Sequence, residues 1–529
     1  MRNVDRKLSR GLLAVGLALV LLAGACSSSG GDTEGSSSTT PSSEGGDVNR
    51  DGTLNLGFDL NQNGNFTWEP GANSSLPSLD SVWYLVYGRL MRAQEDGTIV
   101  PDQAESVTVV DANTIDIKLR PNQTWQDGAP FDAASVKAGL DHNLETDPTV
   151  SGFTQPFYAA KGGVTVVDPT TVRVKISDGT APSWYDSFIA NPQVTITRPG
   201  NYTGTPIGAG PMKVTAYSPG TTLTLERHEG FWDADEIGFA GIDFVQVSNA
   251  QAQSATAALK AGQADIVTFD TTQIASMTGN LEAITLGDPS RLMRMGFCKR
   301  DEPLNNQKIR LAISKAIDRD ALNDAVFEGT ATPAIQLWPE GNQFFSTEVG
   351  DELDYDLEGA KQLVAESGVS NPTFDLYILD NLGIPDAATV IEQQLKAVGI
   401  TANIKVTPNL PAEFLTPQAP GATIFPATQN AGLLKMKDFN GTSLSNLCSY
   451  NNAEFDAAFK KLSTVASDTD DAKQAWWTVE KVYAEEVPGV PLLFASVVGG
   501  YDKDRLVLGG VYPNGLNLMP DIYSSYIAS

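Results

Sequence analysis

The segment from Phe374 to Val406 constrains the fold most, because its apolar pattern changes period twice. Phe374–Leu379 reads as a strand, and a helix then opens at Pro385 and ends at Gly399. Apolar residues recur along that helix at helical spacing, and they are Ala387, Val390, Ile391, Leu395 and Val398. Residues 400–406 alternate apolar and polar as a second strand. A strand–helix–strand crossover normally joins parallel strands, so the chain is predicted to have an α/β fold.

The remaining patterns divide the chain into a strand-rich first half and a more helical second half. The predicted strands are 53–58, 114–119, 164–167, 171–176 and 221–225. The predicted helices are 132–144, 249–260, 306–318, 453–465 and 471–486. The apolar run 492–498 reads as a buried strand that returns to complete the sheet of the first half.

The N-terminus has the pattern of an export signal. Four basic residues precede an uncharged apolar run, 11–23, that is too short to span a bilayer comfortably. The run ends in L-A-G-A-C, which resembles the lipobox where a bacterial lipoprotein is cleaved and acylated on its cysteine, here Cys26. Residues 27–47 are nearly all Ser, Gly, Thr, Asp and Glu, a composition that predicts a disordered tether. The alternative is ordinary signal cleavage and a fully secreted product.

The chain is strongly acidic, with a formal net charge of −28. Removal of residues 1–25 leaves 32 basic and 63 acidic residues, a net charge of −31. Affinity for nucleic acid depends on clustered Lys and Arg. We therefore expect no nucleic-acid partner, and we expect contact with the membrane through the lipid anchor only.

The residues required for most catalytic and metal sites are scarce. His142 and His228 are the only histidines, so a multi-histidine metal cage is excluded, and His228 is expected in a solvated loop. No G-x-S-x-G or phosphate-loop motif occurs. We expect no catalytic residue, metal or cofactor. A secreted hydrolase with paired carboxylates stays open as an alternative, because so many acidic residues guarantee some suitable pair.

Two cysteines follow Cys26 in the sequence. In an exported chain, Cys298 and Cys448 could form a disulfide, and two unpaired buried thiols are the alternative.

Several phrases resemble the extracellular solute-binding family typified by oligopeptide- and dipeptide-binding proteins. Residues 97–106 read G-T-I-V-P-D-Q-A-E-S, residues 119–131 read L-R-P-N-Q-T-W-Q-D-G-A-P-F, and residues 206–212 read P-I-G-A-G-P-M. In the second half, 303–319, 355–368 and 394–400 also resemble the family. Gly97, Gly128 and Gly208 in these phrases are expected to allow turns at positive φ.

The resemblance implies a two-lobed, periplasmic-binding-protein-like (type II) fold with mixed sheets, a hinge, and a small extra domain on the first lobe. The first lobe would comprise 48–87, 203–285 and 492–529, the extra domain 88–202, and the second lobe 286–491. It also implies a non-enzymatic monomer that delivers a small solute or peptide to the permease subunits of an ABC importer. The protein would be exported and anchored at the outer face of the cytoplasmic membrane.

By the same resemblance, the ligand would contact residues from three segments: Asn61, Trp68, Trp83, Tyr84, Trp338, Gln429 and Asp438. The chain departs from the family in the last segment. Peptide-binding members carry W-x-x-D-Y-x-D-P, whose acid holds the peptide ammonium group, whereas this chain reads T-Q-N-A at 428–431 and K-D-F-N at 437–440. Asp438 could replace that acid. A peptide-like solute is therefore the first prediction, and an oligosaccharide or other polar solute stacked on the aromatic residues is the second. A surface adhesion or sensor protein is a third alternative.

Overall fold

The structure is a computed structural model. It describes residues 49–60, 68, 80–93, 99–145, 159–176, 196–201, 204–248, 252–285, 291–298, 302–380, 383–407, 421–428, 451–462, 464–466, 469–512 and 518–528. The predicted signal and tether lie outside these residues. Within them, no helix is both long enough and apolar enough to cross a membrane.

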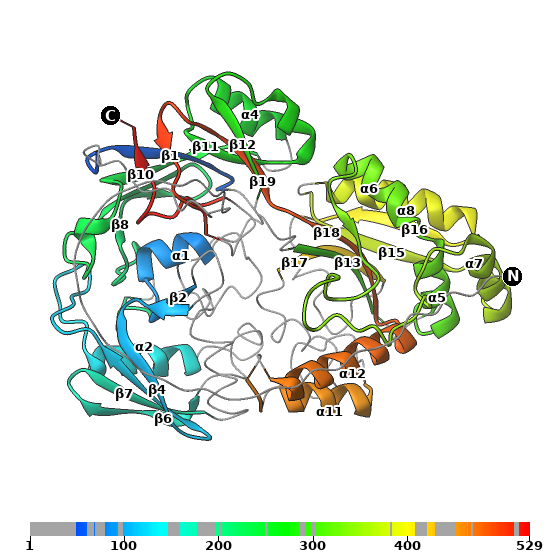
Figure 1. The fold of residues 1–529 in the computed structure, drawn as a ribbon, viewed down its shortest axis with the longest axis horizontal. Coiled ribbons are helices and arrows are strands. Elements are labelled where there is room, and N and C mark those ends of the chain that lie inside the picture. The colour runs from blue at the N-terminus through cyan, green and yellow to red at the C-terminus, as the bar shows by residue number, and fades with distance from the viewer. Residues whose placement is uncertain are drawn as a thin grey trace, which may run out of the picture. The chain divides into compact units, whose positions relative to one another are not determined.

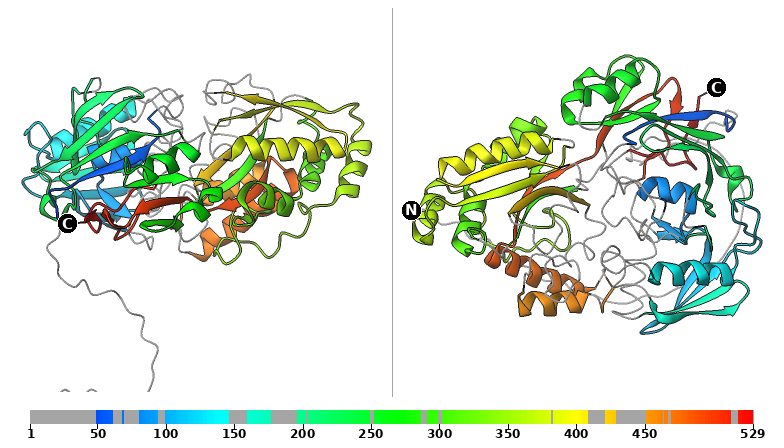
Figure 2. Two further views of the ribbon diagram at one scale, coloured as in Figure 1. Left: turned by 90° about the horizontal axis from the view of Figure 1, so that it is seen from above. Right: turned by 180° about the vertical axis from the view of Figure 1, so that it is seen from behind.

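A seven-stranded mixed sheet joins segments from the two ends of the described chain (Figure 1). Its strands, in spatial order, are β12 (Leu281–Thr285), β19 (Val498–Asp502), β11 (Ile266–Phe269), β1 (Thr53–Phe58), β10 (Gly241–Gln246), β9 (Thr222–Arg227) and β8 (Met212–Ser218). Strand β1 pairs in parallel with β10 and β11, whereas β19 is antiparallel to β11. The predicted strands at 53–58 and 221–225 are thereby confirmed. Figure 2 shows β1 (blue) and β19 (red) in this sheet from two further directions.

A second mixed sheet has six strands. In order, they are β14 (Thr332–Pro333), β18 (Gly489–Ala495), β13 (Arg291–Phe297), β17 (Ala422–Thr428), β15 (Thr373–Ile378) and β16 (Thr401–Val406). Strands β15 and β16 are parallel, with Phe374 opposite Ala402, and helix α8 (Ile384–Ala397) connects them. The strand–helix–strand unit is confirmed.

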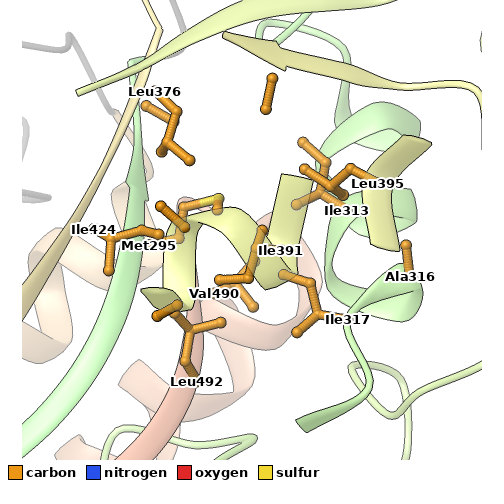
Figure 3. Close-up of a cluster of buried hydrophobic side chains, with 14 of the residues drawn as sticks. Met295, Ile313, Ala316, Ile317, Leu376, Ile391, Leu395, Ile424, Val490 and Leu492 are labelled. Carbon is orange, nitrogen blue, oxygen red and sulfur yellow. The ribbon is translucent and has the colours of Figure 1, made fainter. Parts of the chain in front are cut away.

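The core of this second sheet forms where the apolar faces of two helices meet its strands (Figure 3). Helix α5 (Gln307–Ala316) contributes Ile313, and α8 contributes Ile391 and Leu395. The Asn306 side chain caps α5 by accepting a hydrogen bond of 3.0 Å from the Lys308 backbone N–H. The amphipathic helix predicted here is therefore confirmed, with its end at Ala316 and not at Asp318.

The prediction that the apolar run 492–498 belongs to the sheet of the first half is wrong for most of the run. Residues up to Ala495 belong to β18, which pairs with β13 and β14 in the six-stranded sheet. The chain crosses to the seven-stranded sheet between Ala495 and Val498, where β19 begins. All seven residues of β18 are buried. A strand buried on both faces has no alternation to show which sheet it joins.

A four-stranded antiparallel sheet lies within residues 104–176. Its order is β4 (Ala104–Asp111), β5 (Thr114–Leu119), β7 (Thr171–Ile176) and β6 (Ala159–Asp168), and helix α2 (Ala133–Glu145) packs against β6 and β7. The predicted strands at 164–167 and 171–176 are confirmed, and they pair as the hairpin of β6 and β7 around Asp168. Ile115, Ile117 and Val172 are among the buried residues of its separate core.

The remaining elements are shorter or lie outside the three main sheets. They are α1 (Asp80–Tyr87), β2 (Met91–Ala93), β3 (Ile99–Pro101), α4 (Ala252–Lys260), α6 (Arg319–Phe327), α7 (Leu357–Ser367), α11 (Ala453–Leu462), α12 (Asp470–Glu486), β20 (Leu506–Val507) and β21 (Tyr526–Ile527), with 3₁₀ helices at Ala234–Glu236 and Thr271–Ser276.

Candidate ligand-binding site

The predicted ligand contacts divide into residues that the structure describes and residues that it does not. Asn61, Gln429 and Asp438 lie outside the described residues, as do Cys26 and Cys448. The described ones are Trp68, Trp83, Tyr84, Trp338 and Cys298.

Trp83 and Tyr84 lie on α1 and are 0% exposed in the core of the seven-stranded sheet. The Tyr512 hydroxyl donates to the Tyr84 hydroxyl at 3.1 Å, and the two rings meet edge to face at 5.1 Å. Burial is the main cause that raises the pKa of Tyr84 to about 12. Both aromatic residues therefore pack against protein in this structure, and ligand contact by either stays a prediction.

Trp68 is also part of this core, with 8% of its surface exposed. The Tyr87 hydroxyl donates a hydrogen bond to the Trp68 carbonyl oxygen, which ties this residue to the end of α1. The indole meets the Tyr217 ring of β8 edge to face at 5.4 Å.

Trp338 differs from the other three because it is partly exposed. Its ring packs against two aromatic residues that also contact each other, with centroids 5.0 Å from Phe344 and 5.0 Å from Trp476 of α12. The other three described aromatic candidates are buried.

Several hydrogen bonds fix the segment 334–346 that carries Trp338. Gln336 and Ser346 bond each other twice, from Gln336 Nε2 to the Ser346 carbonyl at 2.8 Å and from the Ser346 N–H to Gln336 Oε1 at 2.9 Å. Trp477 Nε1 donates to the Phe345 carbonyl at 3.0 Å. Arg319 Nε donates to the Ala334 carbonyl at 2.8 Å. These hydrogen bonds fix the segment against the six-stranded sheet and α12.

Two arginines lie inside β13, a strand with every residue buried. Arg291 is opposite Thr428 of β17, the residue that precedes the predicted contact Gln429. Burial lowers the pKa of Arg291 to about 10. The Arg294 guanidinium lies over the Phe425 ring, 4.5 Å from its centroid. Positive charge is thus buried beside the strand that leads into the predicted ligand segment.

The phrase at 97–106 places a buried acid among cations and aromatic rings. Asp102 is fully buried, and Trp232 Nε1 donates to its Oδ1 at 3.0 Å. The Arg120 guanidinium stacks over Trp232 at 3.6 Å, and its Nε donates to the Asp102 carbonyl at 2.6 Å. Burial is the main cause that raises the pKa of Asp102 to about 6. This motif residue therefore joins the four-stranded sheet to the segment after β9.

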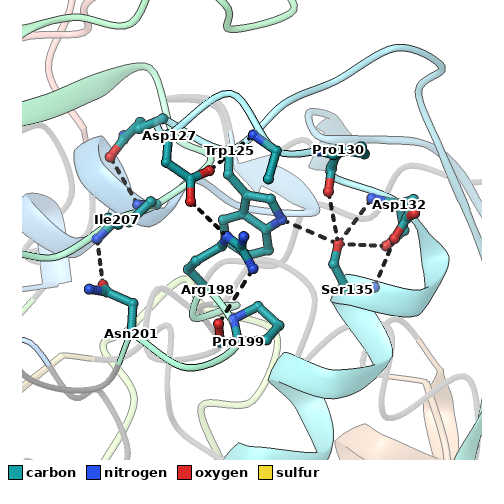
Figure 4. Close-up of polar contacts among 12 residues, drawn as sticks. Trp125, Asp127, Pro130, Asp132, Ser135, Arg198, Pro199, Asn201 and Ile207 are labelled. Carbon is teal, nitrogen blue, oxygen red and sulfur yellow. Dashed lines mark hydrogen bonds and ion pairs between the residues drawn. The ribbon is translucent and has the colours of Figure 1, made fainter.

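The phrase at 119–131 is likewise built into packing and turns (Figure 4). Trp125 Nε1 donates to Ser135 Oγ at 3.3 Å, and the Arg198 guanidinium lies 5.7 Å from the Trp125 ring centroid. Arg198 Nε and Asp127 Oδ2 form an ion pair at 3.2 Å. These motif residues stabilise the fold and do not indicate which ligand is bound.

The expectation for His228 is wrong, because its side chain is only 7% exposed. Its Nδ1 lies 3.1 Å from the Gly210 carbonyl, and burial is the main cause that lowers the pKa of the imidazole. The His228 N–H also donates to the Pro211 carbonyl at 2.8 Å. These contacts join segments that are distant in sequence, so a local polar sequence does not predict the burial. Within the part of the chain that the structure describes, no group of three His, Cys, Asp or Glu side chains could hold a metal ion.

Cys298 is buried at the end of β13 and takes part in a disulfide. Its backbone N–H donates to the Gly421 carbonyl at 2.9 Å, next to the start of β17. Cys448 lies outside the described residues, so the pairing of Cys298 with Cys448 stays a prediction.

Residues 98–480 match the model of the bacterial extracellular solute-binding proteins, family 5 middle. The chain belongs to this family. Family 5 members are binding proteins and not enzymes, and the mixed α/β fold described above is their two-lobed fold. As an extracellular solute-binding protein, the chain is exported.

Curated relatives of this family 5 protein include the glutathione-binding protein GsiB. The GsiB of Escherichia coli strain K12 is 24% identical over 452 residues, which cover 80% of this chain and 84% of GsiB. The match to GsiB of Salmonella paratyphi A is 27% identical over 333 residues and spans 63% of that protein's length.

Solved structures of family 5 proteins share the fold. The oligopeptide-binding protein AppA from Bacillus subtilis, in complex with a nonapeptide, superposes with a TM-score of 0.76 at 17% identity, covering 91% of this chain and 100% of AppA. NikA from Staphylococcus aureus, in complex with Ni(L-His)2, gives a TM-score of 0.76 at 17% identity, covering 90% of this chain and 100% of NikA.

Sequence reasoning about this family 5 protein missed two buried charged groups near the candidate site. Arg291 opens the strand R-L-M-R-M-G-F, and an arginine in an otherwise apolar strand is the signal that marks it. Glu480 lies between Trp476 and Tyr483 at helical spacing, so it interrupts the apolar face of α12.

Proposed function

We propose that the protein is the lipid-anchored solute-binding component of an ABC importer and that it captures a peptide-like solute between its two lobes. The solute stabilises the closed arrangement because it contacts both lobes only there, and the closed form delivers it to the permease subunits. The protein acts as a monomer at the outer face of the cytoplasmic membrane.

The match to GsiB across 80% of the chain carries the choice of a peptide-like solute. GsiB is named for glutathione, and the AppA structure holds a nonapeptide. An oligosaccharide is less well supported, because Trp83 and Tyr84 have no exposed ring face for stacking.

Lipid anchoring rests on the sequence alone. The L-A-G-A-C motif at Cys26 and the Ser- and Gly-rich residues 27–47 have the arrangement that a tethered lipoprotein needs.

We further propose that the seven-stranded sheet belongs to the first lobe and the six-stranded sheet to the second. The chain would then pass from the second lobe to the first at 495–498, in place of the boundary predicted at 492.

A thermal-shift screen of residues 27–529 tests the proposal. The panel contains reduced glutathione, peptides of three to nine residues, maltooligosaccharides and Ni(L-His)2. A bound solute stabilises the folded state by roughly 3 to 4 kcal/mol at 100 to 1,000 times the dissociation constant. We expect the melting temperature to rise with glutathione or peptides.

The other outcomes of the screen contradict the proposed solute. A rise with oligosaccharides alone would assign the protein to carbohydrate uptake. A rise with Ni(L-His)2 alone would make it a metal-chelate binder. Turnover of a peptide or glycan substrate would indicate the hydrolase alternative.

A further inference from the structure

A buried carboxyl group of α12 holds the backbone of the segment that carries Trp338. Glu480 is 1% exposed. The Leu337 N–H donates to its two oxygens, at 3.0 Å to Oε1 and 3.2 Å to Oε2. The Trp338 N–H is also hydrogen-bonded to this carboxyl group. A single side chain therefore fixes the orientation of two consecutive peptide groups, 143 residues away in sequence.

The same helix also fixes the Trp338 side chain. Trp476 lies one turn before Glu480 and meets the Trp338 ring edge to face at an interplanar angle of 82°. Helix α12 thus fixes both the backbone and the ring of Trp338, and Phe344 also packs against this ring.

Without the carboxyl group, two buried peptide N–H groups would lack their acceptor. Each such loss costs roughly 1 to 3 kcal/mol when the group stays buried. The segment can avoid this cost by turning these N–H groups toward water, which would move the Trp338 ring. The hydrogen bonds to Glu480 are therefore well placed to set where the partly exposed indole lies.

The surroundings of Glu480 favour its uncharged form. Burial is the main cause that raises the pKa of Glu480 to about 8. The titratable group that interacts with it is Tyr483, one turn later on α12, and the Tyr483 hydroxyl in turn interacts with Arg294 of β13. Glutamine has nearly the same shape as glutamate and keeps one acceptor oxygen for these N–H groups, without a charge.

We propose that Glu480 is a positioning residue for solute binding, which holds the Leu337–Trp338 backbone so that the Trp338 indole forms part of the solute-contacting wall. This inference rests on the proposed function and deepens it. Glu480 itself does not touch the solute.

The test combines one measurement without a solute and one with it. Tryptophan indole N–H signals of the ¹⁵N-labelled protein are recorded for wild type, Glu480→Leu, Glu480→Gln and the surface control Glu485→Gln, whose side chain is 58% exposed. Trp338→Phe identifies the Trp338 signal among the eight tryptophans. We expect Glu480→Leu to shift the Trp338 signal and to leave that of Trp125 in place. Glu480→Gln and the control should change neither.

Affinity for reduced glutathione and trialanine is then measured by calorimetry at pH 7. Glu480→Leu should weaken binding about tenfold, the equivalent of one to two hydrogen bonds, and Glu480→Gln should stay within about twofold of wild type. In a Trp338→Ala background, Glu480→Leu should cause no further loss, because residues that act through one another are non-additive.

An unchanged Trp338 signal in a folded Glu480→Leu protein would overturn the inference. An equal loss of affinity with and without Trp338 would overturn it too, since Glu480 would then act elsewhere. If wild type binds neither probe, the proposed function fails for these solutes, and the indole signals still decide whether Glu480 positions Trp338.

Discussion

Gln126 and Gly208 hold two distant family phrases together through a pair of hydrogen bonds. The Gln126 backbone N–H donates to the Gly208 carbonyl at 2.9 Å, and the Gly208 N–H donates to Gln126 Oε1 at 2.9 Å. Gln126 Nε2 also donates to the carbonyls of Val86, at the end of α1, and of Met212 in β8, at 2.9 and 2.6 Å. The phrases at 119–131 and 206–212 therefore meet helix α1 at one point.

Gly208 is needed there because of close packing. The expectation of a positive φ is confirmed for Gly128, at 83°, whereas Gly208 is not among the positive-φ glycines. A Cβ on Gly208 would lie 1.8 Å from the Val86 carbonyl oxygen. We predict that Gly208→Ala lowers the free energy of unfolding by about 2 to 4 kcal/mol, as backbone has to move.

Denaturant unfolding of Gly208→Ala and of Gly350→Ala checks this prediction. At Gly350 a Cβ would meet only the flexible Glu352 side chain, at 3.1 Å, so we expect a much smaller loss. Equal stability of the Gly208→Ala protein and wild type would show that the α1 contact is not tight.

Asp102 predicts how stability depends on pH. Its pKa is raised from 3.8 to about 6 in the folded protein, so the folded state retains a proton that the unfolded state loses. This contribution to stability is present below the unfolded pKa and is lost as pH rises through about 6. In Asp102→Asn it is absent. We predict that the stability of Asp102→Asn relative to wild type rises by a few kcal/mol between pH 4 and 7.

Glu480 gives a second pH range over which the stability of a variant can be compared with that of wild type. Its pKa is raised from 4.5 to about 8, so Glu480→Gln should gain stability relative to wild type over a range that extends to about pH 8. A stability difference that is flat with pH for both variants would mean that neither carboxyl group keeps its proton on folding.

The disulfide of Cys298 predicts a redox-dependent stability. A cross-link to Cys448 would close a long loop, and removal of a native disulfide typically costs 2 to 5 kcal/mol. We expect dithiothreitol to lower the melting temperature of wild type and to leave that of Cys448→Ser unchanged. Intact mass under oxidising conditions should be about 2 Da lower than after reduction. A reductant-insensitive wild type would contradict the pairing.

Lipid anchoring is tested by membrane fractionation. Wild type should sediment with membranes and partition into detergent, whereas Cys26→Ser should be soluble, because it lacks the thiol that the proposed anchor requires. Equal distribution of the two proteins would indicate ordinary signal cleavage and a secreted product.

Local patterns predict the parts of this fold whose burial is one-sided. The α8 helix and its flanking strands were predictable because Ile391 and Leu395 mark one buried face. The sheet of β18 was not, since a strand buried on both faces carries no register signal.

The partners of buried charged residues could not be predicted from the sequence for a different reason. Arg319 donates to carbonyls from four separate places in the sequence, including Ala334 and Pro491, and such partners cannot be found by looking along the helix. Aromatic residues posed the same difficulty at the site. Trp83 is buried in a core and Trp338 is partly exposed, although the residue type is the same.

Calorimetric titration of residues 27–529 with reduced glutathione and with tripeptides tests solute capture most directly. The account predicts saturable binding of one solute per molecule, weakened in Trp338→Ala at a temperature where that variant is still folded. Binding of an oligosaccharide or Ni(L-His)2, with no heat from glutathione or any peptide, would contradict it.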